Sequence, residues 1–293
     1  MDILKETFSI QIHSKWQGLT LDALLKDQLA FGKKTIHQWR MDKSILINGE
    51  LKPWKDSLSE GDVISFEYEA SPSAPAWNKE IELLYEDEHL IIVNKPAGLD
   101  THPNTEKDTK TLQHAVVHYL LSKDHTGYAQ PVHRLDRDTT GAILFAKHPG
   151  IKPLLDSLLE KRLIKRTYIA IAEGKLKQSG TISEPIGKDR HHPSRRRVSP
   201  GGQKAVTHYH CLQYNAESNL SLVELNLETG RTHQIRVHLS SIGHPIFGDQ
   251  LYGSTNRHVK YHALHAKKLS FQHPFSHKNI EVIAGTPSHF SKN

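Results

Sequence analysis

The chain has 293 residues, more than one average domain needs, so a large core with a smaller additional module is the simplest division. Its 38 lysines and arginines against 32 aspartates and glutamates give a net charge of +6, which suits an anionic partner. Its single cysteine excludes an internal disulfide and a cysteine-cluster metal site. The start of the chain lacks the pattern of a secretion signal and the longest apolar runs are only strand-sized, so we expect a cytoplasmic protein without a membrane segment.

The first part of the chain combines helical and strand patterns. Leucines recur at helical spacing over residues 21–29, and strands are expected at residues 45–49, which end in an Asn-Gly turn, and 63–66. This order of elements resembles the S4 RNA-binding domain, although Thr20 stands where relatives usually carry arginine. We therefore predict a small α+β, S4-like RNA-binding domain over residues 1–69. A capping domain without RNA contact is the alternative.

Small residues and two prolines follow, and they predict a linker over residues 70–80. In the remaining region, residues 81–293, strand and helix patterns alternate without the spacing of repeated parallel crossover units. Strands are expected at 83–84, 90–93 and 223–227, and helices at 112–120, capped by Asp108, and 151–159. The fold class expected is α+β, with a mixed, largely antiparallel central sheet and flanking helices.

Two motifs far apart in this region stand out. They read His133-Arg134-Leu135-Asp136-Arg137-Asp138-Thr139-Thr140-Gly141 and Gly230-Arg231-Thr232-His233-Gln234-Ile235-Arg236-Val237-His238. Arg134 and Arg137 flank Asp136, and each nearby positive charge lowers the pKa of a carboxylate. Asp136 is therefore expected to stay ionised and available for chemistry.

Together the motifs resemble the pseudouridine synthases of the RluA family, whose signature around the catalytic aspartate reads His-Arg-Leu-Asp-x-x-Thr-[Ser/Thr]-Gly. Further blocks follow the family's order: Val93-Asn94-Lys95-Pro96-Ala97-Gly98-Leu99, Arg166-Thr167-Tyr168-Ile169-Ala170, residues 243–253 and Leu264-His265-Ala266. The resemblance implies an isomerase that converts specific uridines of ribosomal large-subunit RNA or transfer RNA to pseudouridine. It also implies no cofactor or metal. Neither a membrane nor an obligatory protein partner is expected.

The resemblance implies catalytic roles for three residues. Asp136 would attack ribose C1′ or remove the C2′ proton to give a glycal, and both routes need its carboxylate. We predict that Arg231 pairs with Asp136, because a guanidinium fork holds a carboxylate in a fixed orientation. Tyr168 offers a ring on which an extruded uracil stacks and a hydroxyl for removal of the C5 proton. A strand-end salt bridge for Arg231 and a core position for Tyr168 are the structural alternatives.

A base buried in RNA structure must leave its stack to reach Asp136, so the site is expected in a cleft lined with phosphate contacts. Arg134 and His133 are expected to position RNA or to support the catalytic loop. For the run of arginines at 195–197, a solvated surface loop is the alternative. The complete set of predicted substrate-binding residues is Arg134, His133, Lys95, Arg166, Leu227, Arg190, Arg195, Arg196 and Arg197.

Three other classes match parts of the sequence. Residues 136–140 also fit the Asp-x-Asp-x-Thr motif of haloacid-dehalogenase-type phosphatases, but the segment before them is polar and not a buried strand. A non-catalytic RNA-binding protein on a synthase scaffold is a second possibility, against which Asp136, Tyr168 and Arg231 argue. Histidine pairs suggest a zinc hydrolase, but the sequence has no His-Glu-x-x-His.

Overall fold

A computed structural model describes residues 4–257, 259–287 and 290 of the chain. In this part of the chain the N-terminal module is a three-stranded antiparallel sheet of order β1-β3-β2 with helices beside it. Its elements are β1 (Leu4–Gln11), η1 (Ser14–Trp16), α1 (Leu21–Ala23), the π-helical η2 (Leu24–Gln28), α2 (Lys33–Asp42), β2 (Ile45–Ile47) and β3 (Val63–Ala70). The turn after β2 needs positive φ at two positions, which Asn48 and Gly49 supply, as an Asn-Gly turn typically does.

Ten of the remaining strands form one large sheet of order β4-β5-β7-β14-β8-β13-β12-β9, in which β15 also pairs with β14 and β6 with β7. Every pairing is antiparallel except β7 with β14, so the predicted fold class, a mixed and largely antiparallel sheet with flanking helices, is confirmed. The strands of this sheet are β4 (Glu82–Glu86), β5 (Leu90–Lys95), β6 (Gln130–Pro131), β7 (Thr140–Ala146), β8 (Lys165–Glu173), β9 (Ser179–Ile182), β12 (Thr207–Asn215), β13 (Leu220–Leu227), β14 (Leu264–Gln272) and β15 (Asn279–Ile283).

Strands β5 and β7 are buried on both faces, which explains their nearly continuous apolar sequences. Ile91 and Val93 on one face share a core with α3 (Leu112–Leu121). Leu90 and Ile92 on the other face pack into a second core that includes α4 (Lys152–Glu160). The first of the two sequence motifs, residues 133–141, joins β6 to β7. The segment that carries Asp136 is therefore attached directly to a strand that is buried on both faces.

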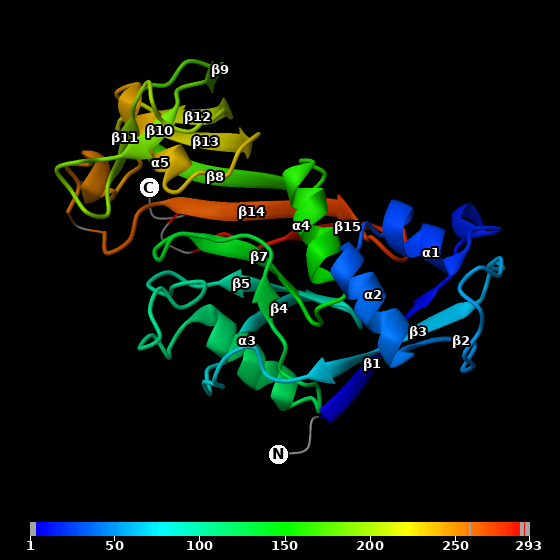
Figure 1. Ribbon diagram of the computed structural model, residues 1–293. Coiled ribbons are helices and arrows are strands. Elements are labelled where there is room, and N and C mark those ends of the chain that lie inside the picture. Colours follow the sequence, from blue (N-terminus) through cyan, green and yellow to red (C-terminus); the bar gives the residue numbers. More distant parts are fainter. Residues whose placement is uncertain (1–3, 258, 288–289, 291–293) are drawn as a thin grey trace.

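The second core also contains the N-terminal module, which therefore packs against the rest of the protein. In Figure 1 this module, blue to cyan, lies beside α4, whereas β8 to β13 lie toward the opposite end of the sheet. Phe8 of β1 stacks on His148 with ring centroids 4.1 Å apart, and a Cβ atom at Gly150 would lie 2.1 Å from the Phe8 ring. The absence of a side chain at Gly150 thus makes room for the module.

Near the other end, a short two-stranded ribbon and a helix flank the candidate site. The ribbon pairs β10 (Ile186–Lys188) with β11 (Arg196–Val198), and we call residues 186–198 the basic hairpin. The helix is α5 (Gln234–Ser241), followed by the single turn η3 (Gln250–Tyr252). In Figure 1 the hairpin and α5 lie close together.

The helices and strands predicted from periodicity are present, but one cap is wrong. Thr111 caps α3, and its hydroxyl and backbone pair with His114, whereas Asp108 accepts hydrogen bonds from the backbone of Asn104 and Thr105. Among the described residues no helix combines the length and apolar character that crossing a membrane requires.

Candidate active site

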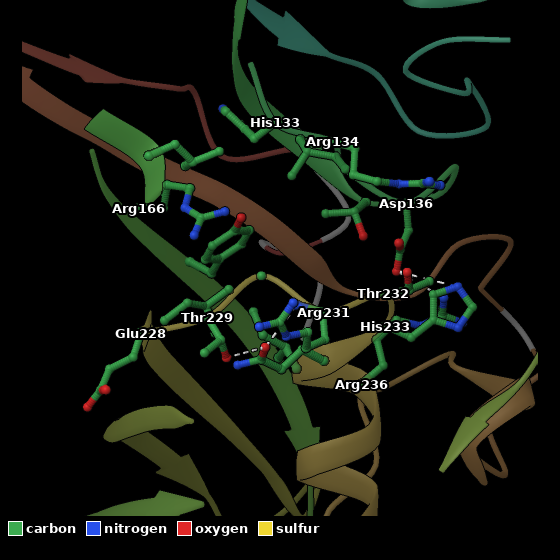
Figure 2. Close-up of a pocket in the computed structure, with 18 of the residues that line it drawn as sticks. His133, Arg134, Asp136, Arg166, Glu228, Thr229, Arg231, Thr232, His233 and Arg236 are labelled. Atoms are coloured by element: carbon green, nitrogen blue, oxygen red, sulfur yellow. Dashed lines mark hydrogen bonds and ion pairs between the residues drawn. The ribbon is translucent and has the colours of Figure 1, made fainter. Parts of the chain in front are cut away.

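A cavity of about 560 Å³ lies where three segments of the chain meet. The loop from β6 to β7 supplies Asp136, β8 supplies Tyr168, and the segment between β13 and α5 supplies Arg231. Figure 2 shows these segments around the cavity, with charged side chains along its walls. The structure therefore gathers in one cavity the three residues predicted to be catalytic.

Asp136 keeps 16% of its side-chain surface exposed and accepts a hydrogen bond from Nη1 of Arg236, at 3.2 Å. Burial by itself raises the pKa of the Asp136 carboxyl, but the nearby His233 and Arg236 outweigh this effect and hold the pKa below its usual value. The carboxylate is therefore ionised near neutral pH, as the sequence predicted.

The predicted pairing of Arg231 with Asp136 is wrong. Arg231 is exposed at the cavity wall, and its Nε donates to the carbonyl oxygen of Lys204 at 3.1 Å. Arg236 lies in the first turn of α5 and makes two further hydrogen bonds, through Nε and Nη2, to the carboxylate of the buried Asp249, at 2.7 and 2.9 Å. Its fork thus spans two carboxylates, a geometry that lysine lacks.

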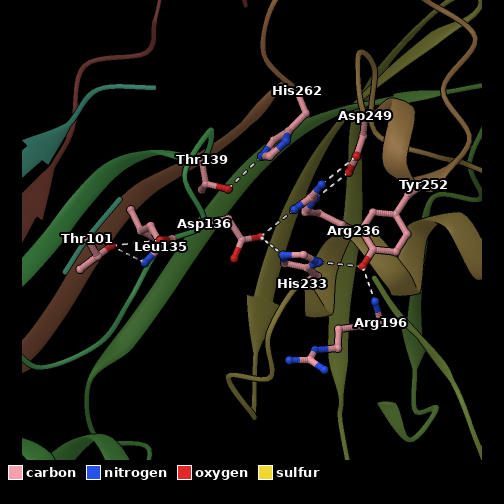
Figure 3. A network of polar contacts seen from close by, with 10 residues as sticks. All are labelled: Thr101, Leu135, Asp136, Thr139, Arg196, His233, Arg236, Asp249, Tyr252 and His262. Carbon is pink, nitrogen blue, oxygen red and sulfur yellow. Dashed lines mark hydrogen bonds and ion pairs between the residues drawn. The ribbon is translucent and has the colours of Figure 1, made fainter. Parts of the chain in front are cut away.

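The loop that carries Asp136 is anchored by polar groups in the protein interior (Figure 3). The backbone of Leu135 makes two hydrogen bonds with the hydroxyl of Thr101, and the hydroxyl of Thr139 bonds His262 Nε2 at 2.9 Å. His262 is buried, and this burial lowers its pKa to about 4, so it is neutral at pH 7. These contacts fix the backbone on both sides of Asp136.

Lys95 belongs to this anchor, and its complete burial contradicts the predicted contact with phosphate. Its side chain is fully buried, and its ammonium donates to the carbonyl oxygens of Pro96, Leu99 and Arg137 at 2.6–3.0 Å. Burial lowers its pKa to about 7, against which the charge of Asp136 acts. The ammonium therefore ties the end of β5 to the residue after Asp136.

Tyr168 lies on β8 with 4% of its surface exposed and lines the same cavity. Burial raises the pKa of its hydroxyl, the Arg166 guanidinium acts in the opposite direction, and Asp136 raises it further. Tyr168 is thus a neutral phenol beside the carboxylate. Arg166 and Leu227, at the cavity ends of β8 and β13, also line the cavity, as predicted for substrate contacts.

The two residues at the start of the catalytic motif differ in exposure. His133 is buried, its Nε2 accepts a hydrogen bond from the Leu144 backbone at 3.3 Å, and burial lowers its pKa to about 3. Of the two functions predicted for it, support of the loop fits these contacts. Arg134 is exposed at the cavity, where an anionic substrate can reach it.

The predicted arginines of the basic hairpin lie at the edge of the site. Arg190, Arg195 and Arg197 are exposed, and Arg196 is half-buried. A second cavity, of about 290 Å³, is lined by Lys188, Arg196 and Arg231 among others, and it shares Arg231 and Thr232 with the first. The two cavities are therefore neighbours, and the second presents positive charge.

Four residues of the site were not singled out from the sequence: Arg236, Asp249, His233 and Tyr252. Arg236 and His233 lie inside the second motif, but nothing in a linear pattern separates Arg231 from Arg236 as the partner of Asp136. His233 has φ 59° at the N-cap of α5, in the left-handed region that few non-glycine residues adopt and in which histidine is more frequent than most.

The fold and this cavity define an enzyme whose carboxylate, phenol and surrounding cations suit a ribonucleotide substrate. Residues 89–241 match the family model described as RNA pseudouridylate synthase, and residues 8–64 match that of the RluD ribosomal pseudouridine synthase N-terminal domain. The chain belongs to the RluA-type RNA pseudouridine synthases, and it is an isomerase, as the sequence predicted.

Relatives match over nearly the whole chain. The chain is 47% identical to the uncharacterized RNA pseudouridine synthase YhcT of Bacillus subtilis, over 95% of this chain and 93% of that protein. It is 36% identical to the ribosomal large subunit pseudouridine synthase D of Escherichia coli K12, over 92% and 88%. The solved structure of human RNA pseudouridylate synthase domain containing 1 superimposes with a TM-score of 0.61 at 25% identity, covering 73% of this chain and 86% of that one.

Both the geometry of the site and the family of the chain exclude the phosphatase alternative. Asp136 lies in a loop between a two-residue strand and β7, whereas the phosphatase motif needs its first aspartate at the end of a buried strand.

Proposed function

We propose that this enzyme isomerises uridine in large-subunit ribosomal RNA in the cytoplasm, with Asp136 as the catalytic carboxylate and without a cofactor. The observation that carries the proposal is an ionised aspartate at the wall of a 560 Å³ cavity that also contains Tyr168. Ribosomal RNA is favoured over transfer RNA because relatives named for the ribosomal large subunit match nearly the full length of the chain.

The reaction breaks the bond from N1 of uracil to ribose C1′ and makes a bond from C5 to C1′. A proton leaves C5 and a proton is gained at N1, so atoms and electrons balance within the nucleotide, and no oxidant or energy source is needed. A carboxylate that attacks C1′ or removes the C2′ proton is restored when the new bond has formed. One ionised carboxylate is therefore sufficient for either route.

The neighbours of Asp136 suit both routes. Arg236 holds the carboxylate through a charge-assisted hydrogen bond, whose strength increases in a partly buried site. Tyr168 places an aromatic face and a phenol in the cavity, which supports stacking of the detached uracil and removal of the C5 proton. Leu227 and Arg166 complete the wall near the base.

RNA binding is assigned to the charged edge of the site. Arg134, Arg190 and the arginines at 195–197 are placed to neutralise phosphates on either side of an extruded uridine.

We also propose that residues 1–69 form an S4-like RNA-binding domain, that residues 70–80 link it to a catalytic domain over 81–293, and that no protein partner is required.

Sequencing of pseudouridine in total RNA from cells with and without this protein tests the proposal. We expect at least one site in large-subunit ribosomal RNA to disappear with the protein and to return with the wild-type gene. If only transfer RNA sites disappear, the assignment of substrate is wrong, and if no site changes, the proposed function is wrong.

A further inference from the structure

A chain of polar contacts joins the basic hairpin to the catalytic carboxylate (Figure 3). The backbone N–H of Arg196 in β11 donates to the hydroxyl oxygen of Tyr252, at 2.9 Å. The same hydroxyl lies 2.8 Å from Nδ1 of His233. On the other side of the imidazole, Nε2 lies 3.9 Å from Oδ2 of Asp136.

The backbone N–H of Arg196 can only donate, so the Tyr252 oxygen accepts from it and the Tyr252 proton remains available for His233 Nδ1. We assign Tyr252 as the donor in the second bond, and long-range ¹⁵N spectra test this assignment. The neutral imidazole then carries its proton on Nε2, the nitrogen that faces Asp136. Burial lowers the pKa of His233, whereas the charge of Asp136 acts in the opposite direction.

The ring of Tyr252 also lies between cations of the two regions. The guanidinium carbon of Arg236, which holds Asp136, is 4.9 Å from the ring centroid, and that of Arg195 in the hairpin is 5.8 Å from it. Both distances are within the range of cation–π attraction. The position of Tyr252 is fixed, because its backbone makes hydrogen bonds to the backbone of Asp249 and to the hydroxyl of Ser240. It therefore contacts the hairpin and the catalytic ion pair at the same time.

We propose that Tyr252 and His233 are positioning residues that transmit the docking of the basic hairpin on RNA to the orientation of Asp136. The inference rests on the proposed function of Asp136. The hairpin has two strands of three residues, and such a ribbon has little stability of its own, so phosphate contacts are expected to fix it. Once the Arg196 amide is fixed, it fixes the Tyr252 hydroxyl. That hydroxyl in turn orients the imidazole of His233, whose Nε2–H faces the Asp136 carboxylate.

The backbone at His233 supports this role. A residue at the N-cap of a helix commonly caps it with its side chain, yet His233 makes no such bond and adopts φ 59° instead. That conformation directs its ring toward Tyr252 and Asp136. Asparagine tolerates positive φ better than other non-glycine residues, so His233→Asn removes the imidazole with little strain.

The experiment compares three variants with the wild type on large-subunit ribosomal RNA purified from cells that lack the protein. Tyr252→Phe keeps the ring and removes only the hydroxyl, and His233→Asn removes the imidazole. Tyr119→Phe is the matched control, because the Tyr119 hydroxyl makes one 2.8 Å hydrogen bond to Glu86 away from the site. For each we measure the melting temperature, the dissociation constant by filter binding and the single-turnover rate at saturating enzyme.

For Tyr252→Phe and His233→Asn we expect dissociation constants within about twofold of the wild type and single-turnover rates lower by roughly tenfold or more. The acid limb of the rate is expected to move to higher pH in His233→Asn, since His233 is one of the groups that lower the pKa of Asp136, while Arg236, His262 and Lys95 still face it. Long-range ¹⁵N spectra are expected to show the Nε2–H tautomer of His233 in the wild type and a mixture in Tyr252→Phe.

Wild-type rates in both variants would overturn the inference, as would rate losses explained by weaker binding or matched by Tyr119→Phe. Asp136→Asn in the same assay separates this outcome from failure of the proposed function. If Asp136→Asn is inactive while Tyr252→Phe and His233→Asn are unaffected, only the coupling is wrong. If Asp136→Asn converts uridine normally, the catalytic role proposed for Asp136 is wrong, and if the wild type converts none, the proposed function is wrong.

Discussion

The loop that carries Asp136, in the wall of the first cavity, and the basic hairpin, in the wall of the second, are built in opposite ways. The loop that carries Asp136 is held by buried polar groups, above all the ammonium of Lys95 and the hydroxyl of Thr101. The hairpin makes few such contacts and exposes most of its arginines. The group proposed to react is thus held rigidly, whereas the groups proposed to attract RNA remain in water, where they can follow a phosphate backbone.

The largest effect on the reaction rate is expected when the contact that holds the Asp136 carboxylate is removed. Arg236→Lys removes the fork that bridges Asp136 and Asp249, and we expect the single-turnover rate to fall by about 100-fold or more. Arg231→Lys is the control and is expected to lose less than about tenfold, because Arg231 does not bond the carboxylate in the described structure. If Arg231→Lys lowers the single-turnover rate by more than this, the pairing of Arg231 with Asp136 that the sequence predicted would be supported instead.

Replacement of the loop anchor is expected to act on stability. Lys95→Met removes the donor that the carbonyl oxygens of Pro96, Leu99 and Arg137 share, and the buried Leu99 oxygen loses it in the protein interior. We therefore expect the free energy of unfolding to fall by about 1 to 3 kcal/mol in urea titrations. The fraction that stays folded is expected to bind RNA with wild-type affinity and an unchanged salt slope. Weaker, less salt-dependent binding at wild-type stability would instead make Lys95 a phosphate contact.

The histidines His89 and His273 are buried, like the polar groups that hold the Asp136 loop, and they make the stability of the protein depend on pH. Burial lowers the pKa of His89 and of His273 to about 4, from an unfolded value of 6.5. Because the unfolded chain binds these protons first, stability is expected to be full above pH 6.5 and to fall as the pH drops toward 4, by roughly 2 kcal/mol per histidine between pH 7 and 5. Urea titrations at pH 7, 6 and 5 test this, and His89→Gln is expected to flatten the dependence.

The smallest effect is expected for substitutions in the exposed basic hairpin. Removal of two hairpin charges in Arg195→Ala/Arg197→Ala is expected to weaken RNA binding by about tenfold at low salt, and to reduce the slope of log Kd against log salt by roughly 2. The free energy of unfolding is expected to stay within about 0.5 kcal/mol of the wild type. Lys123→Ala, an exposed charge beyond α3, is the control. Equal weakening by both variants would show that overall charge, not the hairpin, determines affinity.

The sequence predicted most elements of the fold because their apolar periodicity is strong, as in α3 and β13. It also placed Asp136 and Tyr168 at one cavity through family motifs. It did not distinguish Arg231 from Arg236, because the choice depends on where α5 begins and on Asp249, which is distant in sequence. Lys95 was misassigned for a similar reason, since an exposed and a buried lysine look alike until their acceptors are known.

The central claim, that the carboxylate of Asp136 performs the reaction, is tested most directly by Asp136→Asn on the ribosomal RNA that mapping identifies. The wild type is expected to convert the target uridine completely, and the variant to bind the same RNA with equal affinity and form no pseudouridine. Conversion by Asp136→Asn at the wild-type rate would contradict the claim.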